Sequence, residues 1–384
     1  MSEDYAQSPF INASLPPAIV LPYTSLTLLY AISIGFELFL LKNEKRLPVT
    51  SAQLRVFIVL FRIALPLVFV SPNIPINVLF AAVPWFFTSY TARMPIEQLT
   101  LAEWTNKVIK ITSESSENMS VSSIRYRGAA NCCLGVLKWS FMRLFLDPLL
   151  PHKPIFALYY PWFHPLSLIY TILYGVKAYC LLGAVNVFMG LEQVIMGWNM
   201  VQLFDSPIIA SSPRDFWSRR WNRVIRNLLH TQIFLTNKHN TEIAEKEDAY
   251  QQDEDKKRAQ AKNATKKQEI QKYRLNEPSQ VLDHLRSFFS KRHGRGLITF
   301  VVSGVFHELI IMSVCRQITF ENLMFFTIQG VAVLLEVVLR HGALKQEPEG
   351  KTRIICIAAQ LLFMACTGRL FLGPYLRYAY YTDK

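Results

Sequence analysis

The sequence lacks the cysteine patterns of a disulfide framework or a zinc site. Its six cysteines form no CxxC pair, and most lie in apolar stretches, where cysteine behaves as a small buried hydrophobic residue. The stretch before the first apolar run lacks the basic residues of a secretory signal peptide and carries acidic residues instead. We therefore expect the first apolar segment to remain in the protein as a membrane anchor.

The signatures of several other protein classes are also missing. No GxSxG motif occurs, which disfavours a Ser-His-Asp hydrolase. The zinc motif HExxH needs a second histidine four residues after the first, and Ile311 occupies that position after His307. No recognisable DNA- or RNA-binding module accompanies the formal net charge of +13. We expect neither a metal site nor a nucleic-acid partner, and we attribute the basic charge to cytoplasmic loops and lipid headgroups.

Apolar residues are abundant and are concentrated in segments long enough to cross a bilayer, with the charged residues between them. This distribution predicts an all-α polytopic membrane protein with about eight transmembrane helices, plus amphipathic helices on the membrane surface. Two of the spans are expected within residues 165–197, separated near Lys177. The other expected spans are 18–41, 54–70, 76–90, 297–314, 323–340 and 354–372.

Three parts are expected along the chain. Residues 1–90 supply N-terminal transmembrane helices, residues 91–160 form a cytoplasmic or interfacial linker, and residues 161–384 form the core. The core contains a polar insertion, residues 237–295, which has few large apolar side chains and cannot bury a core of its own. Because basic residues favour the cytoplasmic side, we expect both termini and the segments SPNIP and CRQITFEN to face the lumen.

Two adjacent ionisable residues, His307 and Glu308, lie in the middle of an apolar segment. Ionisable groups at bilayer depth are costly and usually functional. The pKa of a histidine can lie near the operating pH, so His307 is a candidate general base, although a core histidine with a local hydrogen bond is the alternative. Neighbours on a helix point about 100° apart, so Glu308 does not face the same cavity, and we assign it no role.

The segment SSPRDFWSRRWN, residues 211–222, is a second candidate site. Ser212 is a predicted N-cap, with Pro213 in the first helical position. Aromatic residues here suit the membrane interface, and the arginines suit either headgroups or the phosphates of an anionic ligand. Asn222 is a neutral hydrogen-bonding group among these residues. The arginines of this basic face are Arg219, Arg220, Arg223 and Arg226.

Two polar residues of a later apolar segment, Gln329 and Glu336, are seven positions apart and share one face of the predicted helix. They either line a polar cavity or form hydrogen bonds with neighbouring helices.

The strings RDFWSRRWN, SGVFHEL and FFTIQG, in this order, resemble the wax synthase-like branch of the membrane-bound O-acyltransferase (MBOAT) family. That branch includes plant long-chain-alcohol acyltransferases and fungal O-acetyltransferases of terpenoid pathways. The resemblance covers about residues 161–373, the wax synthase-like core, and implies an active-site cavity within the membrane. It identifies His307 with the catalytic histidine and Asn222 with a second active-site residue. The chain departs from the pattern at Gln329, where the family often has histidine, and in its long polar insertion.

These features together predict an O-acyltransferase of the endoplasmic reticulum membrane, which esterifies a lipophilic alcohol with acyl-CoA or acetyl-CoA as co-substrate and holds no permanent cofactor. His307 takes the hydroxyl proton, and Asn222 positions the substrate or stabilises the oxyanion. The expected substrate-binding residues are Trp217, Arg219, Arg220, Trp221, Ser303, Gln329 and Glu336. The alternatives are a short-chain O-acetyltransferase acting on a terpenoid hydroxyl, a transporter or channel that uses the in-span polar residues, and a non-catalytic scaffold. The lack of an internal repeat counts against a transporter.

Overall fold

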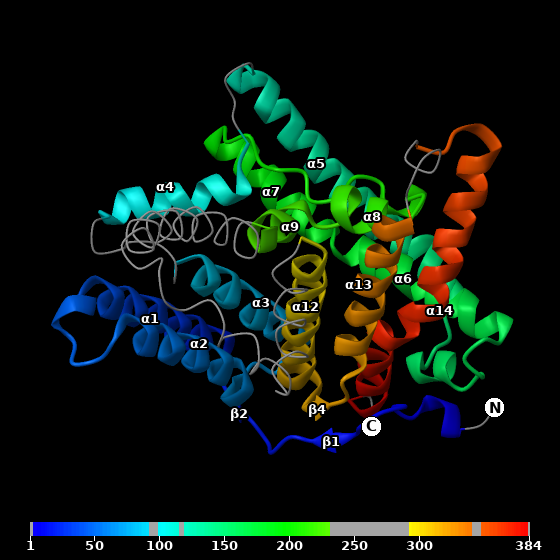
Figure 1. Cartoon of the computed structure of the whole chain (residues 1–384), viewed down its shortest axis with the longest axis horizontal. Helices are drawn as coiled ribbons and strands as arrows, with labels where there is room; N and C mark the ends of the chain where they lie inside the picture. The colour runs from blue at the N-terminus through cyan, green and yellow to red at the C-terminus, as the bar shows by residue number, and fades with distance from the viewer. Residues whose placement is uncertain (1–2, 92–98, 115–118, 231–291, 340–346, 383–384) are drawn as a thin grey trace, which may run out of the picture.

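The computed structural model describes residues 3–91, 99–114, 119–230, 292–339 and 347–382, and these are mostly helical (Figure 1). Most of the polar insertion therefore lies outside the described residues. The helices of the N-terminal half are α1 (Tyr23–Lys42), α2 (Ser51–Val68), α3 (Ile74–Thr91), α4 (Leu101–Thr112) and α5 (Val121–Phe141). Those that follow are α6 (Pro165–Leu181), α7 (Gly183–Met196), α8 (Pro213–Asp215), α9 (Arg223–His230), α12 (Arg292–Cys315), α13 (Glu321–Leu339) and α14 (Gly350–Thr382).

Six helical stretches of the described chain are long and apolar enough to cross a membrane. They are Tyr23–Lys42, Ser51–Val68, Pro165–Met196, Gly294–Cys315, Glu321–Leu339 and Gly350–Tyr378. The chain is thus an all-α, multi-pass integral membrane protein, as the sequence predicts. The predicted count of eight is not confirmed, because α3 is outside this set and Pro165–Met196 forms a single stretch of 32 residues. Its two helices meet at Leu182 instead of near Lys177.

Short strands gather several distant segments at one end of the helices (Figure 1). Strand β1 (Ala13–Ser14) pairs antiparallel with β4 (Gln317–Ile318), and β2 (Ile19–Val20) pairs in parallel with β3 (Phe69–Val70). The side chain of Arg316 donates to the carbonyl oxygen of Leu67 at 2.7 Å and so joins two of these segments. The N-terminal segment and the two loops that we expected on the lumenal side therefore lie together.

Two buried arginines of α14 hold the first described residues against the last helix. Arg369 donates to the backbone carbonyl oxygens of Tyr5 and Leu158, and Arg377 donates to that of Ala6 at 3.1 Å. Arg377 also forms a buried ion pair with Glu321 at the start of α13. These bonds place residues 3–6 beside the C-terminal part of α14, in agreement with Figure 1.

A second buried ion pair joins α1 to α2. The guanidinium of Arg62 lies 2.6 Å from the carboxylate of Glu37, and both side chains are at most 5% exposed. Arg62 also donates to the hydroxyl of Ser33 at 2.7 Å. This charged cluster is thus a buried polar link between two largely apolar helices.

Helix α5 packs antiparallel against α7 at very short range, and glycines permit this approach. A Cβ atom on Gly135 would lie 2.6 Å from the carbonyl oxygen of Gly183, and one on Gly128 would lie 2.7 Å from that of Gly190. Helix α5 belongs to the part that we expected to be an interfacial linker, and the structure packs it along a candidate span. The domain boundaries stay a prediction.

Candidate functional site

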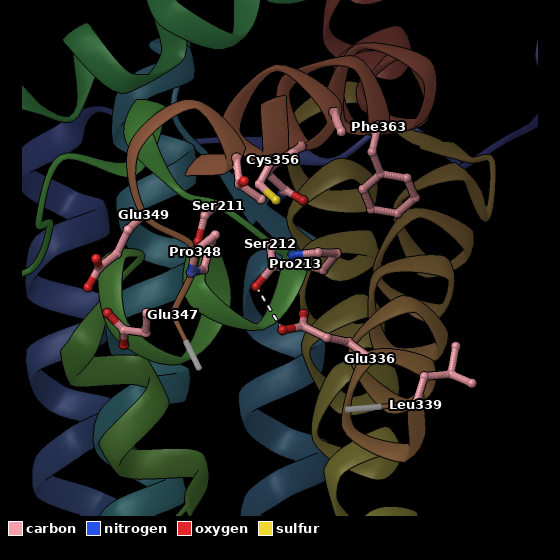
Figure 2. Close-up of a pocket in the computed structure, with 13 residues that line it drawn as sticks. Ser211, Ser212, Pro213, Glu336, Leu339, Glu347, Pro348, Glu349, Cys356 and Phe363 are labelled. Carbon is pink, nitrogen blue, oxygen red and sulfur yellow. Dashed lines mark hydrogen bonds between the residues drawn. The ribbon is translucent and has the colours of Figure 1, made fainter. Parts of the chain in front are cut away.

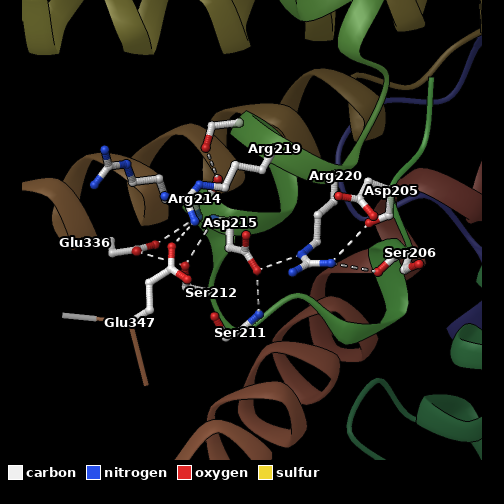
Figure 3. Close-up of polar contacts among 11 residues, drawn as sticks. Asp205, Ser206, Ser211, Ser212, Arg214, Asp215, Arg219, Arg220, Glu336 and Glu347 are labelled. Carbon is white, nitrogen blue, oxygen red and sulfur yellow. Dashed lines mark hydrogen bonds and ion pairs between the residues drawn. The ribbon is translucent and has the colours of Figure 1, made fainter. Parts of the chain in front are cut away.

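The segment that begins at Ser211 is fixed to α13 by one carboxylate. The Ser212 hydroxyl accepts a hydrogen bond from the Asp215 amide at 3.1 Å, which confirms the predicted N-cap of α8. The same hydroxyl donates to Glu336 at 2.8 Å, and the Arg214 amide donates to the other Glu336 oxygen at 2.8 Å (Figures 2 and 3). Glu336 therefore serves as the anchor of this segment.

The basic part of the segment is interrupted near Asn222. A π-helical turn, η8 (Phe216–Arg220), follows the three residues of α8, and α9 begins only at Arg223. Asn222 lies between them with a φ of 39°, in the left-handed region that asparagine tolerates better than most residues. Its side-chain oxygen accepts a hydrogen bond from the Ile225 amide at 3.2 Å and caps α9. A local helix-start role thus exists for Asn222, and its predicted catalytic role stays a prediction.

Two of the predicted anion-binding arginines, Arg219 and Arg220, are held by carboxylates. Arg220 lies 2.8 Å from Asp215, with a further bond of 3.2 Å to the Asp205 carbonyl oxygen, and Arg219 pairs with Glu347 (Figure 3). The bond to Glu347 raises the pKa of Arg219. These pairs orient the guanidinium groups on the surface of η8.

Two adjoining cavities lie beside this segment. The larger, of about 600 Å³, lies between α8, the end of α13 and the first turns of α14 (Figure 2). Its lining includes Ser212, Glu336, Leu339, Thr352, Cys356, Ala359, Gln360 and Phe363. The smaller, of about 40 Å³, is lined by four arginines, and we name it the arginine groove. These arginines are Arg214, Arg219, Arg220 and Arg353, with Asp215 and Glu347 as its acidic residues. Ser211, Glu347 and Pro348 line both spaces, so the two cavities adjoin.

Trp217 reaches from η8 into the contact between α13 and α14. Its indole N–H donates to the Gln329 side-chain oxygen at 3.0 Å, and the Gln329 amide donates to the Thr367 hydroxyl at 2.9 Å. Gln329 is fully buried. Of the two alternatives for Gln329, the structure therefore shows the hydrogen bond between neighbouring elements.

His307 lies among aromatic side chains. Its ring is 4.3 Å from that of Phe326 and 5.8 Å from that of Phe371, measured between centroids. Its Nδ1 lies 2.8 Å from the carbonyl oxygen of Ser303, which can only accept, so Nδ1 carries the proton of the neutral ring. Nε2 is then unprotonated, which is the form that a general base requires.

The predicted residues fall into two groups. His307, Ser303, Trp217 and Gln329 gather around Phe326, since Trp217 also contacts that ring at 5.5 Å. Arg219, Arg220 and Glu336 lie at the cavities, whereas Trp221 stacks on Phe216 at 5.3 Å. Sequence reasoning missed Thr367, Gln360 and Arg353, which the fold brings to the site from α14.

Glu308 has a clear structural role that the sequence did not reveal. Its carboxylate accepts hydrogen bonds from the backbone amides of Thr319 at 2.9 Å and Phe320 at 2.7 Å. Phe320 has a φ of 57°, a strained conformation for a bulky residue. Glu308 thus stabilises the turn between α12 and α13, on the side away from the cavities.

Comparison with known proteins supports the resemblance seen in the motifs. The chain is similar to three proteins of Arabidopsis thaliana: "Probable long-chain-alcohol O-fatty-acyltransferase 2" (24% identical over 210 residues), "Probable long-chain-alcohol O-fatty-acyltransferase 9" (26% over 210) and "Probable long-chain-alcohol O-fatty-acyltransferase 1" (24% over 210). The matches cover 53–54% of this chain and 48–49% of each relative. The chain therefore spans about half the length of the curated relatives it matches. No family model matches the chain.

Proposed function

We propose that the protein is a membrane-embedded O-acyltransferase that transfers an acyl group from acyl-CoA to a lipophilic alcohol in the endoplasmic reticulum membrane. The names of the similar plant proteins support this reaction class and a long-chain alcohol as acceptor. The observation that carries the proposal is His307, an in-span imidazole whose Nδ1 is engaged by Ser303 so that Nε2 can act as a base.

In the proposed reaction, His307 Nε2 takes the proton of the alcohol while the hydroxyl oxygen attacks the thioester carbonyl carbon. The tetrahedral intermediate then expels the CoA thiolate, which takes that proton from the imidazolium, so the ester and free CoA are the products. The surrounding aromatic rings exclude water, which otherwise competes with the alcohol for the thioester.

Asn222 is proposed as the donor that positions the substrate or stabilises the oxyanion. Because its side-chain oxygen caps α9, the donation falls to its amide N–H groups. Loss of one such donor typically costs about 3–4 kcal/mol of transition-state stabilisation. Asn222→Asp keeps the capping oxygen and removes the N–H groups, and it therefore separates catalysis from capping.

The arginine groove is the proposed binding place for the phosphates of CoA. Four guanidinium groups face two carboxylates there, which leaves a net positive charge suited to phosphate oxygens. The larger cavity adjoins this groove and lies between α8, the end of α13 and the first turns of α14. The alternative function, transfer of an acetyl group to a terpenoid hydroxyl, uses the same residues. The length of the acyl chain that the enzyme accepts distinguishes the two functions.

The test is ester formation in membranes that contain the protein. Labelled acyl-CoAs of several chain lengths, including acetyl-CoA, are offered with a panel of fatty alcohols, terpenoids and sterols. We expect a long-chain ester, and we expect His307→Ala to lower its rate by at least about 100-fold, since a positioned base contributes roughly 10² to 10⁴. The matched control is His152→Ala, which replaces an exposed histidine outside the site. Undiminished activity of correctly inserted His307→Ala overturns the role of His307, and a wild type inactive with every pair overturns the proposed function.

A further inference from the structure

Gln360 is a buried polar side chain that lines the larger cavity and has no hydrogen-bond partner among the described residues. It is 4% exposed, and both its Nε2 and its Oε1 are buried without a bond. An amide that forfeits both its donor and its acceptor bonds is costly in a folded protein. The position therefore indicates a ligand group that both accepts from Nε2 and donates to Oε1.

Three of the other polar groups that line the cavity are already engaged. Ser212 and Glu336 bond to each other, and Glu347 pairs with Arg219. The apolar residues that complete the wall are Leu339, Ala359 and Phe363. A fitting ligand segment is consequently uncharged and largely aliphatic, with one N–H and one C=O at the level of Gln360.

The position of Gln360 on α14 relates it to both ends of the proposed site. Arg353, seven residues earlier, lines the arginine groove, and Thr367, seven residues later, bonds to Gln329. Residues seven apart share a helix face, and each interval corresponds to about 10.5 Å of helix rise. Gln329 is in turn less than one helical turn from Phe326, whose ring packs on His307.

We propose that Gln360 is a positioning residue for the acyl donor, and that its side chain forms a two-point hydrogen bond with an amide of the pantetheine arm of CoA. The inference rests on the proposed function and adds the recognition of one part of the donor. The arm carries two amides within about twelve bonds and extends to roughly 14 Å at backbone-like spacing. An amide near its phosphate end, placed at Gln360, leaves roughly 9 Å of chain to the sulfur, which reaches close to the level of Thr367.

This arrangement is tested with three thioester donors that share one acyl chain. They are the acyl-CoA, the acyl-pantetheine, which keeps both amides and lacks the phosphates, and the S-acyl thioester of mercaptoethanol, which has no amide. Wild type is compared with Gln360→Met, which keeps the volume of the side chain and removes its amide. Gln202→Met is the matched control, because it makes the same substitution at an exposed glutamine that lines neither cavity.

For Gln360→Met we expect the KM for acyl-CoA and for acyl-pantetheine to rise about tenfold, the effect of about one hydrogen bond. The kcat/KM for the mercaptoethanol thioester and the KM for the alcohol should equal those of wild type, and Gln202→Met should change none of these values. An equal loss with all three donors, no change with any donor, or a rise in the KM for the alcohol instead overturns the inference while the proposed function stands. A wild type that forms no ester from acyl-CoA overturns both.

Discussion

The buried pair of Arg62 and Glu37 gives a prediction whose size follows from the structure. Both charged groups are at most 5% exposed, lie 2.6 Å apart and join two apolar helices. Arg62→Met leaves the Glu37 carboxylate without its guanidinium, and breaking such a buried pair typically costs about 3–5 kcal/mol. Replacing both residues with methionine removes the uncompensated charge, so the double variant should recover most of that loss.

The assay is thermal unfolding of the purified protein in detergent, for wild type, both single variants and the double variant. We expect each single variant to melt clearly below wild type, and the double variant to melt within a few degrees of it. Additive losses in the double variant would refute the reasoning, because they would show that the two charges do not compensate each other.

Three further predictions concern packing and pH. Gln329→Leu removes the bond that Trp217 donates, and we expect about 1–3 kcal/mol of lost stability together with lower ester formation; a variant with full activity and melting temperature contradicts the anchoring role. Gly135→Leu places a side chain where a Cβ alone would lie 2.6 Å from the Gly183 carbonyl oxygen, so we expect α5 and α7 to separate and insertion yields to fall, measured by protease protection; an unchanged digestion pattern contradicts this. Hydrogen bonding and ion pairing, chiefly with a lysine of α6, lower the pKa of Asp147 below its ordinary 3.8, so Asp147 adds a small stability that is present above pH 3.8 and is lost as the pH falls through the lowered pKa. Asp147→Asn should therefore be slightly less stable than wild type at pH 7 and equal to it at the acid end of a melting series.

Much of the helical fold could be predicted from the sequence, because apolar length and loop charge report directly on bilayer crossing. The N-cap at Ser212 was also predictable, since Ser-Pro before an acidic first turn is a local signal. The break between α6 and α7 was predicted near Lys177, because a charged residue is unfavourable within an apolar helix. That side chain instead pairs with Asp147, and the helix continues to Leu181.

The candidate site was less predictable, because its contacts depend on tertiary distances. The sequence shows that His307 and Gln329 are polar residues within apolar segments. It does not show that the ring of Phe326, from a different helix, lies between His307 and Trp217. The role of Glu308 could not be predicted, because its carboxylate bonds to backbone amides in a turn. Every residue type except proline has a backbone amide, so such a partner cannot be recognised in a sequence. Gln360 looks like any glutamine in an apolar segment until its surroundings are known.

The two arginines that hold residues 3–6 affect the order in which the protein is assembled. The bond from Arg369 to Tyr5 spans 364 positions, so it forms only after α14 has been synthesised. Until then, residues 3–6 cannot occupy their final position, although the intervening helices insert. Contacts between such distant parts of a chain form slowly because closing a long loop costs entropy. The docking of residues 3–6 therefore follows the insertion of α14, and it makes residues 3–6 a reporter of whether α14 has inserted.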